Sequence, residues 1–241
     1  MRYGSLIIIL LYVNSCFSQK KEGENYNMFW LGYYNSVQLN SKWNINTDIQ
    51  HRTKNGYEIQ SQSLIRSSLA YKFNEGIQIS GGVAHFRHFL TNELNRGEWR
   101  PWQEISAAQQ YDKFRLSNKI RIEQRYNQIV VADALTNYYS FNWRFRYKFD
   151  LDVVILKRLS KTHTLNIGNE FMLNAGRSVL NPFDQNRSYV SINYQIATNL
   201  KIQFQYMYIV QYLPSKINYD HISVLRFNLY HTINNERSSG K

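Results

Sequence analysis

The sequence contains a single cysteine, Cys16, and only three prolines in 241 residues. One cysteine cannot form an internal disulfide, so the fold must depend on hydrogen-bonded sheet or on a large core. If a signal sequence is cleaved after Ser18, the mature chain has no thiol, which excludes thiol catalysis and cysteine metal sites. Scarce proline favours long, uninterrupted strands, because proline cannot donate a hydrogen bond to a sheet ladder.

Long hydrophobic runs are also absent. The apolar run from Leu6 to Val13 has about eight residues, far fewer than the roughly 20 that a spanning helix needs. With Arg2 before it and Cys16-Phe17-Ser18 after it, this run is typical of a secretory signal, which predicts export and removal of residues 1–18. Two alternatives stay open, a buried N-terminal strand and lipoprotein processing at Cys16, for which Asn14 fits poorly.

Acidic residues are few, with 17 Asp and Glu against 29 Lys and Arg, which gives a formal net charge of +12. A basic chain suits nucleic acid, anionic lipid or an acidic ligand. Export and the absence of a basic arm or recognition helix argue against nucleic acid. The expected partners are outer-membrane lipids, lipopolysaccharide phosphates or small anions, together with the barrel-assembly machinery. Alternatively, the cations only neutralise carboxylates inside the fold.

Aromatic residues, in contrast, are frequent and regularly spaced. From Tyr139 to Phe149 every odd position is aromatic, and from Ser140 to Lys148 every even position is polar or cationic. A period of two places these side chains on opposite faces of a strand. Segments of about ten to thirteen residues with this alternation recur along the chain, and short turns alternate with longer loops, as in outer-membrane barrels.

This pattern predicts an all-β, antiparallel, up-and-down transmembrane barrel over residues 19–233, followed by a polar tail at 234–241. The mean hydropathy of −0.51 is compatible with a membrane barrel, because only alternate residues face lipid. A direct count gives eleven strands, but bacterial single-chain barrels have even numbers, so we expect about 12, with 10 as the alternative. A soluble lipocalin-like barrel or sandwich would show the same alternation, but its apolar face would point inward and its polar face would meet water. Strand length, the low charged fraction of 19% and the aromatic faces favour the membrane.

The alternation also assigns side chains to faces. The aromatic residues expected to face lipid are Trp43, Phe141, Trp143, Phe145, Phe204 and Tyr206. The expected charge network of the lumen consists of Arg52, Arg115, Lys119, Arg121, Glu123, Arg125, Arg144, Arg146 and Glu170. This network is interpreted either as an Arg–Glu lattice that fills a narrow barrel or as the lining of an anion-selective pore.

Cross-strand pairing inside this network follows from the position of one loop. With a loop over residues 127–137, Arg121 would pair with about Asn142, Lys119 with Arg144 and Arg115 with Lys148. Like charges directly opposite one another are destabilising, so carboxylates or bound anions must offset them.

No spaced motif indicates an active site, so no catalytic residues, metal site or cofactor are expected. His85 and His88 lie three residues apart and therefore on opposite faces of a strand, which does not suit chelation. Either histidine with Ser178 and Asp184 would supply a catalytic triad, but no nucleophile elbow connects them. A lipid-modifying or lipid-cleaving enzyme, and a soluble exported ligand-binding barrel, are therefore the alternatives to a structural or narrow, plugged pore.

A series of short motifs carries a family resemblance. They are Lys42-Trp43 before a strand ending in Arg52, Glu98-Trp99-Arg100 leading into Trp102-Gln103, Arg121-Ile122-Glu123-Gln124-Arg125, Arg144-Phe145-Arg146, Glu170-Phe171 and Phe183-Asp184-Gln185-Asn186-Arg187. In this order they resemble a bacterial family of exported β-barrels catalogued only as a domain of unknown function, number 2490 of that series. The resemblance extends from about Asn27 to Ile233 and implies a porin-like outer-membrane barrel, but it brings no activity and no catalytic residues.

Overall fold

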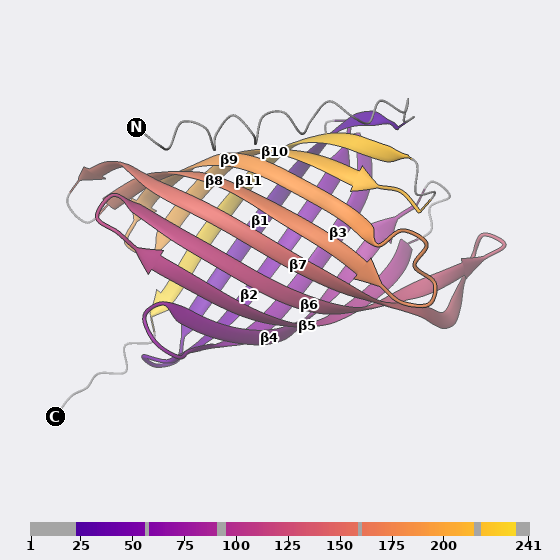
Figure 1. Cartoon of the computed structure of the whole chain (residues 1–241), viewed down its shortest axis with the longest axis horizontal. Helices are drawn as coiled ribbons and strands as arrows, with labels where there is room; N and C mark the ends of the chain where they lie inside the picture. Colours follow the sequence, from indigo (N-terminus) through magenta and orange to yellow (C-terminus); the bar gives the residue numbers. More distant parts are fainter. Residues whose placement is uncertain (1–22, 56–57, 91–94, 159–160, 215–217, 235–241) are drawn as a thin grey trace, which may run out of the picture.

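The computed structural model describes residues 23–55, 58–90, 95–158, 161–214 and 218–234, which form one closed barrel of tilted strands (Figure 1). The signal and the polar tail expected from the sequence lie outside the described residues, apart from Asn234. The strands are β1 (Asn25–Gln38), β2 (Trp43–Lys54), β3 (Ile59–Lys72), β4 (Ile77–Phe89), β5 (Asn95–Gln110), β6 (Phe114–Val131), β7 (Ala134–Arg158), β8 (Lys161–Ala175), β9 (Phe183–Ala197), β10 (Leu200–Tyr212) and β11 (Tyr219–Asn234).

Consecutive strands pair antiparallel, and the barrel closes where β1 and β11 pair in parallel. Their register runs from Asn25 opposite His221 to Gln38 opposite Asn234. The predicted all-β, up-and-down barrel is confirmed. Within the described residues the strands number eleven, one fewer than the roughly 12 expected and equal to the direct count from the alternation. An odd number requires the parallel seam, because the first and last strands of such a chain run in the same direction.

The outer surface is apolar over most of the barrel height. Its middle carries exposed aliphatic side chains, among them Ile45, Ile49, Ile65, Leu69, Ile79, Val83, Ile105, Ile120, Ile192 and Leu225. Outward polar side chains between them bond across strands, as when Gln124 donates to Gln103 and the Tyr147 hydroxyl donates to Asn118. No helix among the described residues has the length and apolar character to cross a membrane.

Aromatic rings gather at both ends of this apolar surface. At one end Trp43 packs against Tyr71, Tyr111 against Phe114 and His163 against Tyr194, with ring centroids 4.7, 4.5 and 4.3 Å apart. At the other end His85 packs against Trp99, Tyr126 against Phe141 and Phe183 against Tyr212, at 4.5, 5.1 and 5.7 Å. Two aromatic belts thus lie at the ends of the surface, and a few further rings, such as Tyr147 opposite Ile120, lie between them.

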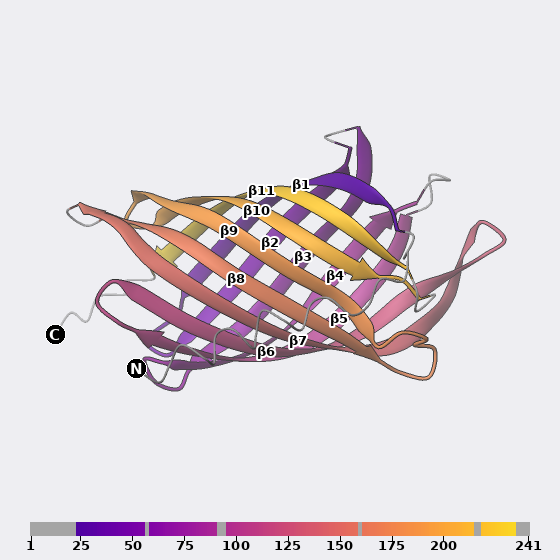
Figure 2. The ribbon, with the colours of Figure 1, turned by 45° about the horizontal axis from the view of Figure 1, so that its top comes forward.

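The two ends of the barrel differ in their connections. Residues 39–42, 73–76, 111–113, 159–160 and 198–199 connect strands at one end, which we call the short-turn end. At the other, the long-loop end, the connections are 55–58, 90–94, 132–133, 176–182 and 213–218. Among these 132–133 is the shortest, and it joins two strands that project beyond their neighbours, as the hairpin of β6 and β7 does in Figure 2; 55–58 has four residues, as 39–42 and 73–76 do.

The β6–β7 hairpin corrects the loop predicted over residues 127–137, most of which lies in strands. Its turn is formed by Ala132 and Asp133, whose φ angles of 47° and 55° are the positive values that a two-residue type I′ turn requires. The prediction was wrong because Ala-Asp lacks the Asn-Gly or Asp-Gly signature of such a turn.

Candidate functional site: the charged lumen

A cavity of about 1640 Å³ occupies the barrel interior. Its wall includes Phe73 and Asn74 at the short-turn end, and Asn181 and Leu213 at the long-loop end. The cavity therefore extends from one end of the barrel to the other. Between these limits it is lined mainly by the inward side chains of the strands, which are even-numbered in β2 and β7 and odd-numbered in β6.

Glu98 on β5 is the most enclosed acidic group of the lumen, with no exposed surface. It accepts hydrogen bonds from Nε of Arg100 and Nε of Arg125, both at 2.6 Å, and it lies 2.7 Å from Nε2 of His88. The pairing of β5 with β4 and β6 places these three partners around it, because Phe86 and Asn127 are the cross-strand neighbours of Glu98. One buried carboxylate thus neutralises part of the charge of two guanidinium groups.

A second cluster follows along β6, β7, β8 and β9. Arg146 lies between two carboxylates, with NH1 2.5 Å from Glu123 and NH2 2.5 Å from Glu170. Glu170 also meets Arg187 at 3.4 Å. Arg146 therefore links three strands through charge-assisted hydrogen bonds, which are stronger than neutral ones.

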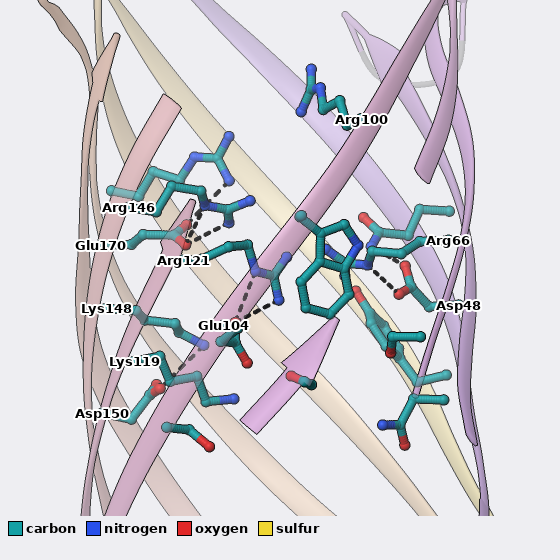
Figure 3. A pocket seen from close by; sticks show the side chains of 18 of the residues that line it. Asp48, Arg66, Arg100, Glu104, Lys119, Arg121, Arg146, Lys148, Asp150 and Glu170 are labelled. Atoms are coloured by element: carbon teal, nitrogen blue, oxygen red, sulfur yellow. Dashed lines mark hydrogen bonds and ion pairs between the residues drawn. The ribbon is translucent and has the colours of Figure 1, made fainter. Parts of the chain in front are cut away.

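Arginines on opposite walls of the lumen approach one another over an aromatic ring. Arg121 pairs with Glu104 at 2.6 Å, and Arg66 pairs with Asp48 at 2.7 Å on the facing wall (Figure 3). Both guanidinium carbons lie over the ring of Trp102, at 4.1 Å for Arg121 and 5.7 Å for Arg66. Side chains from β2, β3, β5 and β6 therefore meet within the cavity at this level.

The lumen carries more positive than negative charge. Among the described residues that line the cavity, sixteen are Lys or Arg and seven are Asp or Glu, with Glu98 and Glu123 buried next to them. Within the described residues eight of the lining cations have no carboxylate at ion-pair distance: Lys42, Arg52, Lys72, Arg96, Arg115, Lys119, Lys201 and Arg226. The Arg–Glu lattice therefore leaves a cationic surplus.

The cross-strand pairing predicted for β6 and β7 is wrong by four residues. Arg121 lies opposite Arg146, Lys119 opposite Lys148, and Arg115 opposite Asp152. Half of the difference comes from the turn at residues 132–133, which lies one position beyond the one assumed, and half from a register shift between Gln128 and Val130. Like charges do oppose each other in two of these pairs, and for Arg121 and Arg146 the carboxylates of Glu104, Glu123 and Glu170 offset the repulsion.

All nine residues proposed for the lumen network have inward positions in the barrel. Arg52, Arg115, Lys119, Arg121, Arg125, Arg144, Arg146 and Glu170 line the cavity, and Glu123 is buried beside them. The six aromatic residues expected on the lipid face, Trp43, Phe141, Trp143, Phe145, Phe204 and Tyr206, point outward and are at least 37% exposed. The structure brings the first set together and distributes the second over the outer surface.

Several members of the lumen charge network were not identified from the sequence. Arg100 precedes Pro101, where the β5–β6 ladder is interrupted, but it shares the inward, even-numbered face of β5 with Glu98 and Trp102, so the alternation could have identified it. Asp184 follows Pro182 in a segment that resembles a loop, but β9 begins at Phe183 and Asp184 pairs with Arg144 at 2.7 Å. Arg66 lies among serines on β3, where no aromatic face marks the strand.

The residues considered for catalysis do not meet. His88 is engaged by Glu98, Asp184 by Arg144, and His85 packs outward against Trp99. Among the described residues no three His, Cys, Asp or Glu side chains converge as metal ligands.

Comparison with known proteins identifies a family and solved structures of distant similarity. A family model described as "Protein of unknown function (DUF2490)" matches residues 27–220, which confirms the family resemblance inferred from the motifs. No curated protein matches the chain. A solved structure of the NanC porin, in a rhombohedral crystal form, is similar at 13% identity with a TM-score of 0.48, over 83% of this chain and 96% of that one. At that score the likeness adds nothing to a fold that rests on strand pairing.

Proposed function

We propose that this chain, which belongs to the DUF2490 family of proteins of unknown function, is an integral outer-membrane barrel that conducts small anions through its cationic lumen. The cationic surplus of a cavity that extends between both barrel ends is the observation that carries the proposal. Outer-membrane lipid would surround the barrel, and the barrel-assembly machinery would insert it after export.

The outer surface supports the membrane location. Phe114 and Tyr126 mark the two aromatic belts on the same strand, β6, with Ile120 exposed midway between them. Twelve residues of a strand tilted by about 40° span roughly 30 Å along the barrel axis, close to the thickness of a bilayer core. Aromatic belts flanking an apolar band are characteristic of transmembrane barrels. A soluble barrel would instead expose this apolar surface to water, which costs free energy over its whole area.

The balance of charge supports anion conduction. Rings of Arg and Lys select anions in pores, and here sixteen lining cations stand against nine carboxylates, Glu98 and Glu123 included. Most carboxylates are engaged by arginines, so they leave little negative potential in the cavity. The unpaired cations occur at both ends, with Arg52 toward the long loops and Arg115 next to a short turn.

The cavity dimensions support a narrow pore. Distributed over a barrel about 35 Å long, a volume of about 1640 Å³ corresponds to a mean cross-section of about 50 Å². The narrowest level is expected where Arg66 and Arg121 face each other over Trp102. Such a channel admits a file of water and small ions and restricts larger solutes.

Conductance of the purified protein in planar lipid bilayers tests the proposal. Under a tenfold KCl gradient, the reversal potential should have the sign of chloride permeation, and single-channel currents should be small because the lumen is narrow. A folded barrel without measurable current would show that the side-chain lattice seals the lumen and that the role is structural. A reversal potential with the sign of potassium permeation would contradict the proposal directly.

A further inference from the structure

The lumen is not polar throughout. On β1, β9, β10 and β11 it carries a buried apolar cluster of Met28, Trp30, Tyr189, Met207, Ile209, Ile222 and Val224. This cluster lines the inside of the parallel seam toward the long-loop end. A pore for simple ions needs no such surface, because apolar walls offer an ion neither charge nor hydrogen bonds.

A side cavity of about 200 Å³ adjoins this cluster and shares Trp30, Arg52 and Arg187 with the wall of the main lumen. We call it the Trp30 niche, and the residues that define it are Met28, Trp30, Arg52, Arg187, Ile209 and Ile222. Lys54 lies at its mouth with Nζ 4.6 Å from the ring of Tyr26. Among the described residues that line the niche there are three cations and no carboxylate, so its charge is uncompensated by its own wall.

The aromatic floor of the niche concentrates positive charge. The guanidinium carbon of Arg52 lies 4.0 Å from the centroid of the Trp30 ring, that of Arg187 5.5 Å and that of Arg226, just outside the niche, 5.7 Å. Only Arg187 has a carboxylate partner, Glu170 at 3.4 Å, and Glu170 is shared with Arg146. Three guanidinium groups around one indole repel each other unless an anion joins them.

Hydrogen bonding at the niche is also incomplete. Arg52 donates to the side-chain oxygens of Gln62 at 2.6 Å and Gln50 at 3.0 Å, but its Nε has no acceptor. Nε1 of Trp30 likewise has no acceptor, although the residue is only 3% exposed. Buried donors without acceptors are rare and costly, but both nitrogens have almost no accessible surface, so they do not themselves face the open volume of the niche.

We propose that the Trp30 niche binds a small organic anion, a carboxylate or phosphate ester with an aromatic or short alkyl body. The anionic oxygens would lie beside the guanidinium groups of Arg52 and Arg187, and the apolar body would lie against Met28, Ile209 and Ile222. The volume equals that of about six or seven water molecules, which suits a ligand with about nine non-hydrogen atoms. This site requires the barrel but not conduction, so it goes beyond the proposed pore.

Benzoate is the probe, titrated into the detergent-solubilised, folded protein by calorimetry. Acetate lacks the apolar body and benzyl alcohol lacks the charge, so both should bind at least tenfold more weakly than benzoate. Arg52→Gln should weaken benzoate binding at least tenfold, because it removes a charge-assisted hydrogen bond. Arg115→Gln removes a lumen cation at the short-turn end and should change the affinity less than twofold.

A second variant protects the test against misfolding of Arg52→Gln. Gln211→Trp fills the niche from its mouth without removing a cation and should abolish benzoate binding in a folded barrel. Equal affinities for benzoate and acetate, or unchanged binding in both niche variants, would overturn the assignment. Anion conductance without benzoate binding would refute the niche alone, and benzoate binding without conductance would refute the pore alone.

Discussion

Replacing Glu98 by Gln probes the lattice at its most enclosed point. The substitution keeps the shape but removes a carboxylate that has no exposed surface and accepts from Arg100 and Arg125. Removing one partner of a buried ion pair costs about 3–5 kcal/mol, because the remaining charge stays buried without compensation. Arg100 retains Glu123 at 3.6 Å, which places the expected loss near the lower value, about 3 kcal/mol.

The assay is reversible urea unfolding in lipid vesicles, followed by tryptophan fluorescence. Glu75→Gln serves as the matched control, since Glu75 is exposed in the turn between β3 and β4 and its replacement should change the free energy of unfolding by less than about 0.5 kcal/mol. A loss of less than about 0.5 kcal/mol for Glu98→Gln would show that the lattice contributes no stability, and the reasoning would then be refuted.

Three further predictions concern the lumen, the hairpin and the outer surface. Combined Arg121→Ser and Arg144→Ser should move the reversal potential toward zero or lower the free energy of unfolding, and no change in either measurement would contradict the lumen assignment. Ala132→Gly should stabilise the barrel by about 0.5–1 kcal/mol in urea unfolding, because alanine is strained at a φ of 47°, and a loss of stability would argue against the type I′ turn. Ile120→Lys should cost about 2–4 kcal/mol in vesicles, because the side chain, 54% exposed, is expected to lie at the bilayer midplane. A cost below about 0.5 kcal/mol would indicate that Ile120 faces water.

The sequence was sufficient to assign side chains to the two faces of a strand where the alternation is strict. In β7 the odd residues from Phe141 to Phe149 are exposed and the even residues from Asn142 to Asp150 are buried or half-buried, as a period of two requires. Because one pattern is shared by all residues of a strand, the faces of the lumen arginines could be assigned without any knowledge of neighbouring strands.

Pairing between strands could not be derived in the same way. Register depends on the turn, and Ala132-Asp133 carries no sequence signal for its backbone conformation. The partners of Arg146 and Arg121 therefore remained unknown until the hairpin was placed. The closure of the barrel between β1 and β11 could not be predicted either, because no local feature of these strands distinguishes a parallel neighbour from an antiparallel one.

The Trp30 niche shows a third limit. Its residues come from β1, β2, β9, β10 and β11, so only closure through the parallel seam brings Trp30 next to Ile222 and Arg226. Met28, Ile209 and Ile222 would each be assigned in isolation to an ordinary buried face. The apolar character of this part of the lumen is therefore a property of the closed barrel and not of any single strand.

The most direct test of a closed barrel embedded in the outer membrane is the heat-modifiability of the mature protein in the outer-membrane fraction. Boiled and unboiled samples are compared by gel electrophoresis in SDS. A barrel held by continuous strand pairing should resist SDS until it is boiled, so the unboiled band should run faster than the boiled one. A protein found in the soluble periplasmic fraction, with the same mobility before and after boiling, would contradict the membrane barrel. The aromatic residues would then have to form the internal core of a soluble protein.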